Sequence, residues 1–171
     1  MKLKALVAAL AVGLTGAAFA QNTGPIKIGI ITDMSSLYAD IDGPAGAEML
    51  KWAVQDFGGK VLNRPIEVLS ADHQNKADVA SSKAREWIDK DGLQMLIGGT
   101  NSGTALAMSK VTTEKKKPFI AIGAGSARLT NEDCSPYTVH YAYDTVSLAK
   151  VAGSALVKAG NMGMLQEYLG V

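Results

Sequence analysis

The sequence predicts an α/β fold in which helices cover both faces of a doubly wound parallel sheet. Two observations predict it. Short apolar, β-branched runs alternate with longer stretches of helical period, and glycine or aspartate follows most of the runs. Strand, helix and strand in regular alternation are typical of βαβ units, which the right-handed crossover rule winds into a parallel sheet. A chain of 171 residues is long enough for one ordinary domain core.

The first two strands and the helix between them are expected within residues 26–71. The near-continuous apolar run Ile26–Ile31 suits a strand that is covered on both faces. Pro65–Ala71 is expected to form the second strand. Between them, apolar residues recur with the spacing of one helix face, and a glycine pair at 58–59 ends the pattern. The residues of this face are Ala45, Met49, Trp52, Ala53 and Phe57.

The remaining elements of the sheet are expected between residues 77 and 122. A second helix is predicted from the spacing of Ala77, Ala80, Ala84, Trp87 and Ile88, with Gly92 just past its end. A third strand over Gln94–Ile97 is followed by a helix from Ser102 to about Lys115. The fourth strand is expected over Pro118–Ile122.

The first twenty residues have the pattern of a secretory signal peptide. Lys2 and Lys4 precede an apolar stretch that ends in the small-residue sequence Ala18-Phe19-Ala20, so cleavage is expected to leave Gln21 first. The alternative is a membrane anchor, which is disfavoured because the apolar core is shorter than the roughly 20 residues a spanning helix needs. Residues 1–20 are therefore assigned to the signal peptide.

Charge and metal-ligand content exclude two classes of function. The 17 Lys and Arg residues nearly balance the 16 Asp and Glu residues and form no basic stripe, so a nucleic-acid partner is not expected. One cysteine and two separated histidines give no metal-ligand cluster, and no metal or cofactor is expected. In an oxidising compartment, the odd Cys134 indicates either a free thiol or a missing disulfide partner.

The glycine-rich segment LIGGTNSGTALAMSK (96–110) does not match two enzyme motifs. A phosphate-binding P-loop needs lysine where Thr104 stands, and a nucleophile elbow needs glycine at Thr100. The later segment GAGSAR (123–128) matches only the first two glycines of a dinucleotide fingerprint. What remains is a helix that opens at Ser102, expected as its N-cap, at the carboxyl edge of the sheet.

A helix start at this edge predicts a site for a small anion such as a carboxylate. The first helical turn has unpaired N–H groups, and the Ser102 hydroxyl lies beside them, followed by Gly103 and Thr104. In open parallel sheets, ligands bind outside the carboxyl ends of the strands. The alternative is that Ser102 only caps its own helix, as serine commonly does.

Several spaced segments together resemble one known family. These are IKIGIITDMSSLYADIDGPAGAEMLKWAVQDFGG, LIGGTNSGTALA and PFIAIGAGSARLT, in that order after a signal peptide. They resemble the leucine/isoleucine/valine-binding type of periplasmic substrate-binding protein of ABC transporters. The resemblance implies a type I periplasmic binding protein lobe and a location in the periplasm. It implies transport of branched-chain amino acids or related small carboxylates, such as aromatic acids, with a membrane ABC permease as partner and no enzymatic activity.

The resemblance also implies roles for individual residues. The family's serine for the ligand α-carboxylate matches Ser102, with Gly103 and Thr104 beside it. The backbone carbonyl that takes the α-amino group matches Gly123. The family's threonine for the same amine falls on Gly125, which has no hydroxyl.

The Gly125 position departs from the family pattern, and Ser126 follows it. A ligand without an amine therefore fits this site at least as well as an amino acid does. Tyr38, in the loop after the first strand, is expected to line the pocket.

The family has two similar lobes, and one lobe is expected here. Residues 21–143 are expected to form the N-terminal ligand-binding lobe, and 144–171 the start of an incomplete second lobe with an unrelated tail, NMGMLQEYLGV. A truncated product is the expectation. A helix from about Thr145 to Ala159 would then expose an apolar stripe of Leu148, Val151, Ala155 and Leu156.

Two other classes of function stay open. An exported α/β enzyme acting on a small carboxylate or phosphate would need an acid and a base in its cleft. The candidates show no recognisable arrangement: Asp33, Asp40, Asp42, Asp72 and His73. A repressor's sensor core is disfavoured by the signal peptide and by the lack of DNA-binding helices.

Overall fold

The computed structural model describes residues 24–160, so the predicted signal peptide at 1–20 lies outside the described residues. Six strands form one sheet in the order β2-β3-β1-β4-β5-β6. Their bounds are β1 Ile26–Thr32, β2 Lys60–Val61, β3 Arg64–Asp72, β4 Leu93–Gly98, β5 Phe119–Ala121 and β6 Thr138–His140. The four predicted strands are β1, β3, β4 and β5, and their observed ends lie within two residues of the predicted ones.

The sheet is parallel except at one edge. β1 pairs in parallel with β3 and with β4, and the parallel pairing continues through β5 to β6. The short β2 is antiparallel to β3. Since β1 lies between β3 and β4, the chain first builds the sheet to one side of β1 and then crosses to the other. The predicted doubly wound parallel sheet is confirmed, with a small antiparallel addition.

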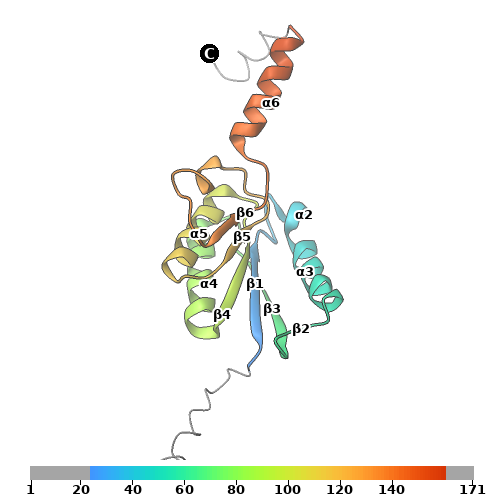
Figure 1. The fold of residues 1–171 in the computed structure, drawn as a ribbon, viewed down its shortest axis with the longest axis vertical. Helices are drawn as coiled ribbons and strands as arrows, with labels where there is room; N and C mark the ends of the chain where they lie inside the picture. Colours follow the sequence, from blue (N-terminus) through green and yellow to red (C-terminus); the bar gives the residue numbers. More distant parts are fainter. Residues whose placement is uncertain (1–23, 161–171) are drawn as a thin grey trace, which may run out of the picture.

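Helices cover both faces of this sheet, and Figure 1 shows them as two layers. α2 and α3 lie on one side of the strands, and α4 and α5 lie on the other. The helix α6 belongs to neither layer and projects away from the sheet. The helical segments are α2 Ala39–Asp42, α3 Pro44–Asp56, α4 Ala77–Glu86, the π-helix η1 Trp87–Asp91, α5 Ser102–Glu114, the 3₁₀-helix η2 Ala127–Leu129, and α6 Thr145–Lys158.

The hydrophobic core lies between the sheet and the α4–α5 layer. Strand residues Leu93, Leu96 and Phe119 are fully buried there, and they belong to one cluster with Ala84 and Met108 from the helices. Burying each large apolar side chain stabilises the fold by about 1.5–3 kcal/mol. The alanines of α4 let the helix approach the strands closely, as their predicted helical spacing required.

The predicted apolar face of α3 points outward. Met49, Trp52 and Phe57 are 58–67 % exposed, and the buried residue of this helix is Ala47. The helix is buried through Ala47, and a Cβ on the neighbouring Gly46 would lie at an ordinary contact distance of 3.8 Å from Ile30 Cδ1 of β1. An apolar stripe usually faces the core, but here the stripe is exposed.

The ends of β3 and α4 also differ from the expectation. β2 and β3 form a hairpin whose two turn residues, Leu62 and Asn63, both have positive φ, as a type I′ turn requires. The strand β2 at Lys60–Val61 was not predicted from the sequence. The predicted second helix is α4 plus the π-helical turn η1, and Gly92, in the left-handed conformation, ends it as expected.

α6 begins at a capping box. Asp144 accepts the Ser147 N–H, and the Ser147 hydroxyl accepts the Asp144 N–H. No residue of α6 is buried, and Leu148 and Val151 are 50 % and 71 % exposed. The predicted helix and its exposed apolar stripe are thus confirmed. None of the helices in the described part of the chain is long and apolar enough to cross a membrane.

Candidate ligand-binding edge of the sheet

The reversal at β1 fixes where a ligand site can form. The loop after β1 leads to α2 and α3 on one face, and the loop after β4 leads to α5 on the other. Such diverging loops open a crevice at the carboxyl edge of the sheet. The candidate residues Tyr38, Ser102 and Gly123 follow β1, β4 and β5 respectively, so all three lie in loops or helix starts at this edge.

Glycines let the β4 loop approach its neighbours. Gly98 has φ 153°, and a Cβ there would lie 2.0 Å from the carbonyl oxygen of Ile31 on β1. Gly99 has φ 97°, and its Cβ would meet Ala105 of α5 at 2.7 Å. The glycine pair therefore turns the chain tightly from strand to helix. It brings the start of α5 directly above the sheet edge.

The start of α5 differs from the prediction in one respect. Asn101, not Ser102, is the N-cap: its Oδ1 accepts the Thr104 N–H at 3.0 Å. Ser102 is the first helical residue. Sequence reasoning had a signal for this, because asparagine caps helices as well as serine does. Because Asn101 caps the helix, the Ser102 hydroxyl is available for another role.

Ser102 joins the loops that follow β4 and β5. Its Oγ accepts the backbone N–H of Ser126 at 3.1 Å. A hydroxyl that accepts one hydrogen bond still has its own proton to donate. The structure therefore brings Ser102 and Ser126, two of the predicted site residues, into direct contact.

The two residues after Ser102 differ in what they offer. Gly103 is exposed at the first turn, where helical N–H groups have no partner inside the helix. Thr104 is 1 % exposed, and its hydroxyl donates to the Asn101 carbonyl at 2.8 Å. The backbone N–H and the hydroxyl of Thr104 therefore both donate within α5 and its N-cap. Its place in the site stays a prediction.

The β5 loop contains Gly123, Gly125 and Ser126. A Cβ on Gly123 would lie 3.1 Å from Thr100 Oγ1, so the loops after β4 and β5 touch here as well. The Gly125 carbonyl accepts the Thr145 N–H at 2.8 Å, and Ser126 Oγ accepts the Arg128 N–H at 3.3 Å. Within residues 24–160, no hydrogen bond is donated to the Gly123 carbonyl, which therefore remains available as an acceptor.

The loop after β1 is organised around Asp33, which the sequence did not single out as a structural residue. This buried carboxylate accepts the N–H groups of Ser36 and Tyr38 and the Ser36 hydroxyl. Burial alone raises the pKa of Asp33, but these hydrogen bonds outweigh it and the pKa is lowered. Tyr38 is half-buried. Its backbone is fixed, and no contact joins it to Ser102 or to the β5 loop.

Asp72, at the end of β3, ties a second loop to this one. Its carboxylate accepts the Met34 N–H, the Ser35 hydroxyl and the Gln74 N–H. Burial raises the pKa of Asp72, and the three hydrogen bonds lower it further than burial raises it. Asp33 and Asp72 are thus held as carboxylates that shape the edge.

The charges of Asp33, Asp72 and Asp42 act on His73, so these acid–base candidates lie near one another at this edge. His73 is fully buried, so it cannot meet a substrate at the surface. The described residues contain no group of three or more His, Cys, Asp and Glu side chains placed to hold a metal ion. Cys134 is a free, exposed thiol in this structure. The arrangement suits binding of a small anion rather than proton transfer.

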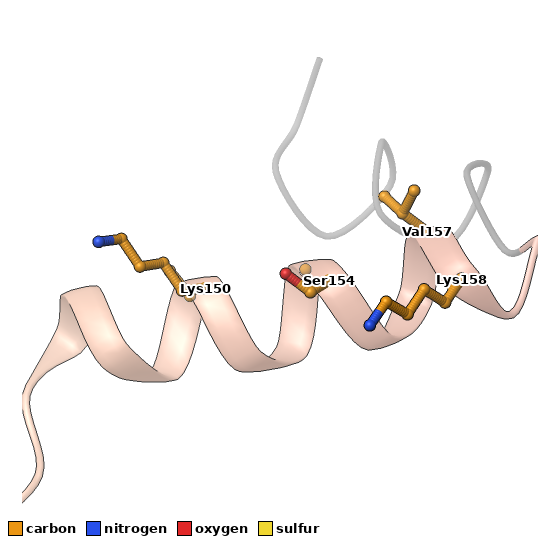
Figure 2. A pocket seen from close by; sticks show the side chains of 6 residues that line it. Lys150, Ser154, Val157 and Lys158 are labelled. Carbon is orange, nitrogen blue, oxygen red and sulfur yellow. The ribbon is translucent and has the colours of Figure 1, made fainter.

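Two pockets open away from the edge. A shallow one of about 390 Å³ follows one side of α6, and Figure 2 shows Lys150, Ser154, Val157 and Lys158 along it. A groove of about 620 Å³ lies between α5 and residues 128–135. Neither contains a predicted site residue, so neither is taken as the ligand site.

Comparison with known proteins decides the family. Residues 25–166 match the sequence model described as periplasmic binding protein. The chain belongs to this family. A periplasmic binding protein of Burkholderia mallei is 68 % identical with a TM-score of 0.77, over 80 % of this chain and 36 % of its own. The fold is therefore the type I periplasmic binding protein lobe, as predicted.

Two further relatives bear on the ligand class. An ABC-transporter solute-binding protein of R. palustris, solved with benzoate, is 30 % identical with a TM-score of 0.72, over 80 % of this chain and 38 % of its own. The Leu/Ile/Val-binding protein homolog 6 of Brucella abortus is 29 % identical over 131 residues, which are 75 % of this chain and 33 % of that protein. The chain spans about a third of the length of the curated relatives it matches. These relatives are transport proteins rather than enzymes.

Proposed function

We propose that the chain is the ligand-binding lobe of an extracytoplasmic solute-binding protein of an ABC transporter. Its ligand is a branched-chain amino acid or a related small carboxylate. The observation that carries this proposal is the position of Ser102. Its hydroxyl lies at the first turn of α5, above the carboxyl edge of β4, and is oriented by the Ser126 N–H.

The chemistry of this corner suits a carboxylate. The Ser102 hydroxyl proton and the first-turn N–H groups of Ser102 and Gly103 are donors, and the positive end of the α5 dipole lies at the same place. Each hydrogen bond to a charged group contributes roughly 1.5–3 kcal/mol. Three donors that converge on two carboxylate oxygens are enough to fix the orientation of a small acid.

The β5 loop favours an acid without an amine. Gly125 has no side-chain oxygen, and its carbonyl is engaged by Thr145. An α-amino group would rely on the Gly123 carbonyl and the Ser126 hydroxyl oxygen in this loop, without the threonine hydroxyl of the family pattern. An aromatic acid such as the benzoate bound by the R. palustris relative needs no such acceptor.

Titration of the chain with benzoate and with leucine tests the proposal. We expect saturable chemical-shift changes at Ser102, Gly103 and Ser126, with the larger affinity for benzoate. A single lobe that supplies half of the roughly 8 kcal/mol of micromolar binding gives a dissociation constant near millimolar. Shift changes confined to other surfaces would refute the site. Export to the periplasm predicts that the mature protein begins at Gln21, which mass spectrometry of the processed chain determines.

Of the five acid–base candidates for an exported enzyme, Asp33, Asp72 and His73 are poorly suited to that role, while Asp40 and Asp42 stay open. Asp33 and Asp72 are engaged by backbone and hydroxyl donors, and His73 is sealed in the interior. A membrane ABC permease is the partner that this function requires, and a small carboxylate is the ligand.

A further inference from the structure

His73 anchors the turn that follows β3. Its backbone N–H donates to the Thr32 carbonyl of β1 at 2.9 Å. Its imidazole Nδ1 accepts the Asn75 N–H at 2.9 Å, and the side chain is fully buried. An Nδ1 that accepts has no proton, so the ring is neutral with its single proton on Nε2.

The turn depends on this bond because its backbone is unfavourable. Gln74 and Asn75 have φ of 51° and 57°, in the left-handed region that non-glycine residues rarely occupy. Asp72 holds the Gln74 N–H, and the His73 ring holds the Asn75 N–H. Losing either acceptor removes one of the two side-chain bonds that keep two consecutive residues in this conformation.

We propose that His73 is a proton-operated latch: the neutral ring keeps the turn 72–76 closed against the loop 33–38, and a second ring proton opens it. A doubly protonated imidazole has an N–H at both nitrogens. Its Nδ1–H would then face the Asn75 N–H, so two donors meet where one hydrogen bond was. The hydrogen bond from the Asn75 N–H is lost because the protonated Nδ1 can no longer accept it.

The charged groups around the ring set the pH at which this happens. Burial lowers the pKa of His73, and the carboxylates of Asp33, Asp72 and Asp42 counter it only in part. Asp33 and Asp72 already accept several hydrogen bonds, whereas Asp42 Oδ2 is buried without a partner within residues 24–160. Asn75 Oδ1 and His73 Nε2 are likewise buried without a partner in this part of the chain, so Asp42 and Asn75 both offer an oxygen to an imidazolium.

Opening reaches the candidate ligand edge through Asp72. The same carboxylate that holds the Gln74 N–H also holds Met34 and Ser35. Those residues begin the loop that ends at Tyr38. Acid would thus loosen the loop that follows β1. The Ser102–Ser126 hydrogen bond, which joins the segments after β4 and β5, would stay in place. The latch is independent of which ligand the edge binds.

Nitrogen NMR of the chain tests the latch directly. At pH 7.5, we expect the His73 Nδ1 to show the shift of an unprotonated ring nitrogen. As the pH is lowered until the His73 ring signals titrate, the Asn75 amide should lose at least tenfold in protection from exchange, after correction for the intrinsic rate. A proton on Nδ1 at neutral pH, or Asn75 protection that does not follow His73, overturns the proposal.

A pair of variants separates the latch from general acid effects. His73→Asn places an amide oxygen near the position of Nδ1, an acceptor that acid does not remove. Asn75 protection should then stay constant over the same pH range. The chain has two histidines, and the control is His140→Gln, because the ring Nε2 of His140 donates to the Ala124 carbonyl and takes no part in the turn 72–76. The control should retain the tenfold loss. If His73→Asn does not fold, the titration of the unmodified chain alone decides.

Discussion

Ser102 Oγ and the Ser126 N–H are 3.1 Å apart, and their hydrogen bond joins the loops that leave two neighbouring strands. This bond adds to two other links between the same segments, namely the Ile122 N–H donated to the Gly98 carbonyl and the close approach of Gly123 to Thr100. The bond also orients the Ser102 hydroxyl, whose proton is left to point away from Ser126. The same hydrogen bond therefore links the two loops at the candidate site and orients the Ser102 hydroxyl that would donate to a ligand.

Ser102→Ala should weaken carboxylate binding about tenfold or more. The variant loses one charge-assisted hydrogen bond, worth roughly 1.5–3 kcal/mol. NMR titration with benzoate gives the dissociation constants. The matched control is Ser81→Ala, which removes an exposed α4 hydroxyl bonded to its own helix. Equal constants for the two variants would rule out a role for Ser102.

Asn101→Ala should destabilise the fold by about 1 kcal/mol, because the Thr104 N–H loses its acceptor. This corresponds to a drop in Tm of about 2–4 °C for a chain of this size. Asn101→Ser should keep most of the stability, since serine is an equally good cap. Thermal unfolding followed by circular dichroism measures both. A Tm for the alanine variant that equals the serine one would show that the cap contributes little.

Acid should unfold the chain in two separate pH ranges. The pKa of His73 is lowered below its ordinary 6.5, so the unfolded chain binds more protons and stability falls as the pH drops below about 6.5. The pKa values of Asp33 and Asp72 are lowered below 3.8, so their contribution is complete above that pH and is lost as the pH falls through the folded values.

Urea unfolding at a series of pH values separates the two ranges. Asp33→Asn should flatten the decline below pH 4, and it should extend the His73-dependent decline to lower pH, because the Asp33 charge favours the protonated ring of His73. The exposed residue Asp91 provides the control, as Asp91→Asn should alter neither. A decline below pH 4 that is the same in all three proteins would contradict the role given to Asp33.

A chain that ends after Thr145 should be as stable as the longer one. α6 buries no residue, while Thr145 makes both contacts of this region with the β5 loop: it donates to Gly125 and accepts from Ala127. We expect the Tm to change by less than about 1 °C and aggregation to decrease, since the exposed apolar stripe is removed.

Trypsin should cleave the longer chain first at Lys150 or Lys158 in α6. Mass spectrometry of a short digest identifies the cuts. First cleavage within the sheet or at α4 would mean that α6 is better protected than its exposure indicates.

Strand positions were predictable because buried parallel strands consist of uninterrupted apolar residues. Ile26–Ile31 comes close to this composition, with Lys27 as its one charged residue, and no helical period competes with it. The end of α4 was predictable for a similar reason, since Gly92 is suited to the left-handed cap. Local chemistry determined both features.

The errors arose where tertiary contacts outweighed local pattern. The α3 stripe has the spacing of a core face, but the residue of this helix that is buried is Ala47, which lies outside the stripe. In the segment Asn101-Ser102, two good capping residues are adjacent, and sequence alone does not choose between them. The roles of Asp33 and Asp72 depend on donors from loops that only the folded sheet brings together.

The central place of β1 in the sheet also governs how the chain folds. β1 pairs with Ile66 and its neighbours on one side and with Met95 and its neighbours on the other, although these strands come much later in the chain. Such pairing of distant segments costs loop-closure entropy before it returns any burial, and it slows folding. One edge of β1 therefore stays unpaired until β4 has been synthesised. Until then, its apolar residues remain available to any protein that binds unfolded chains.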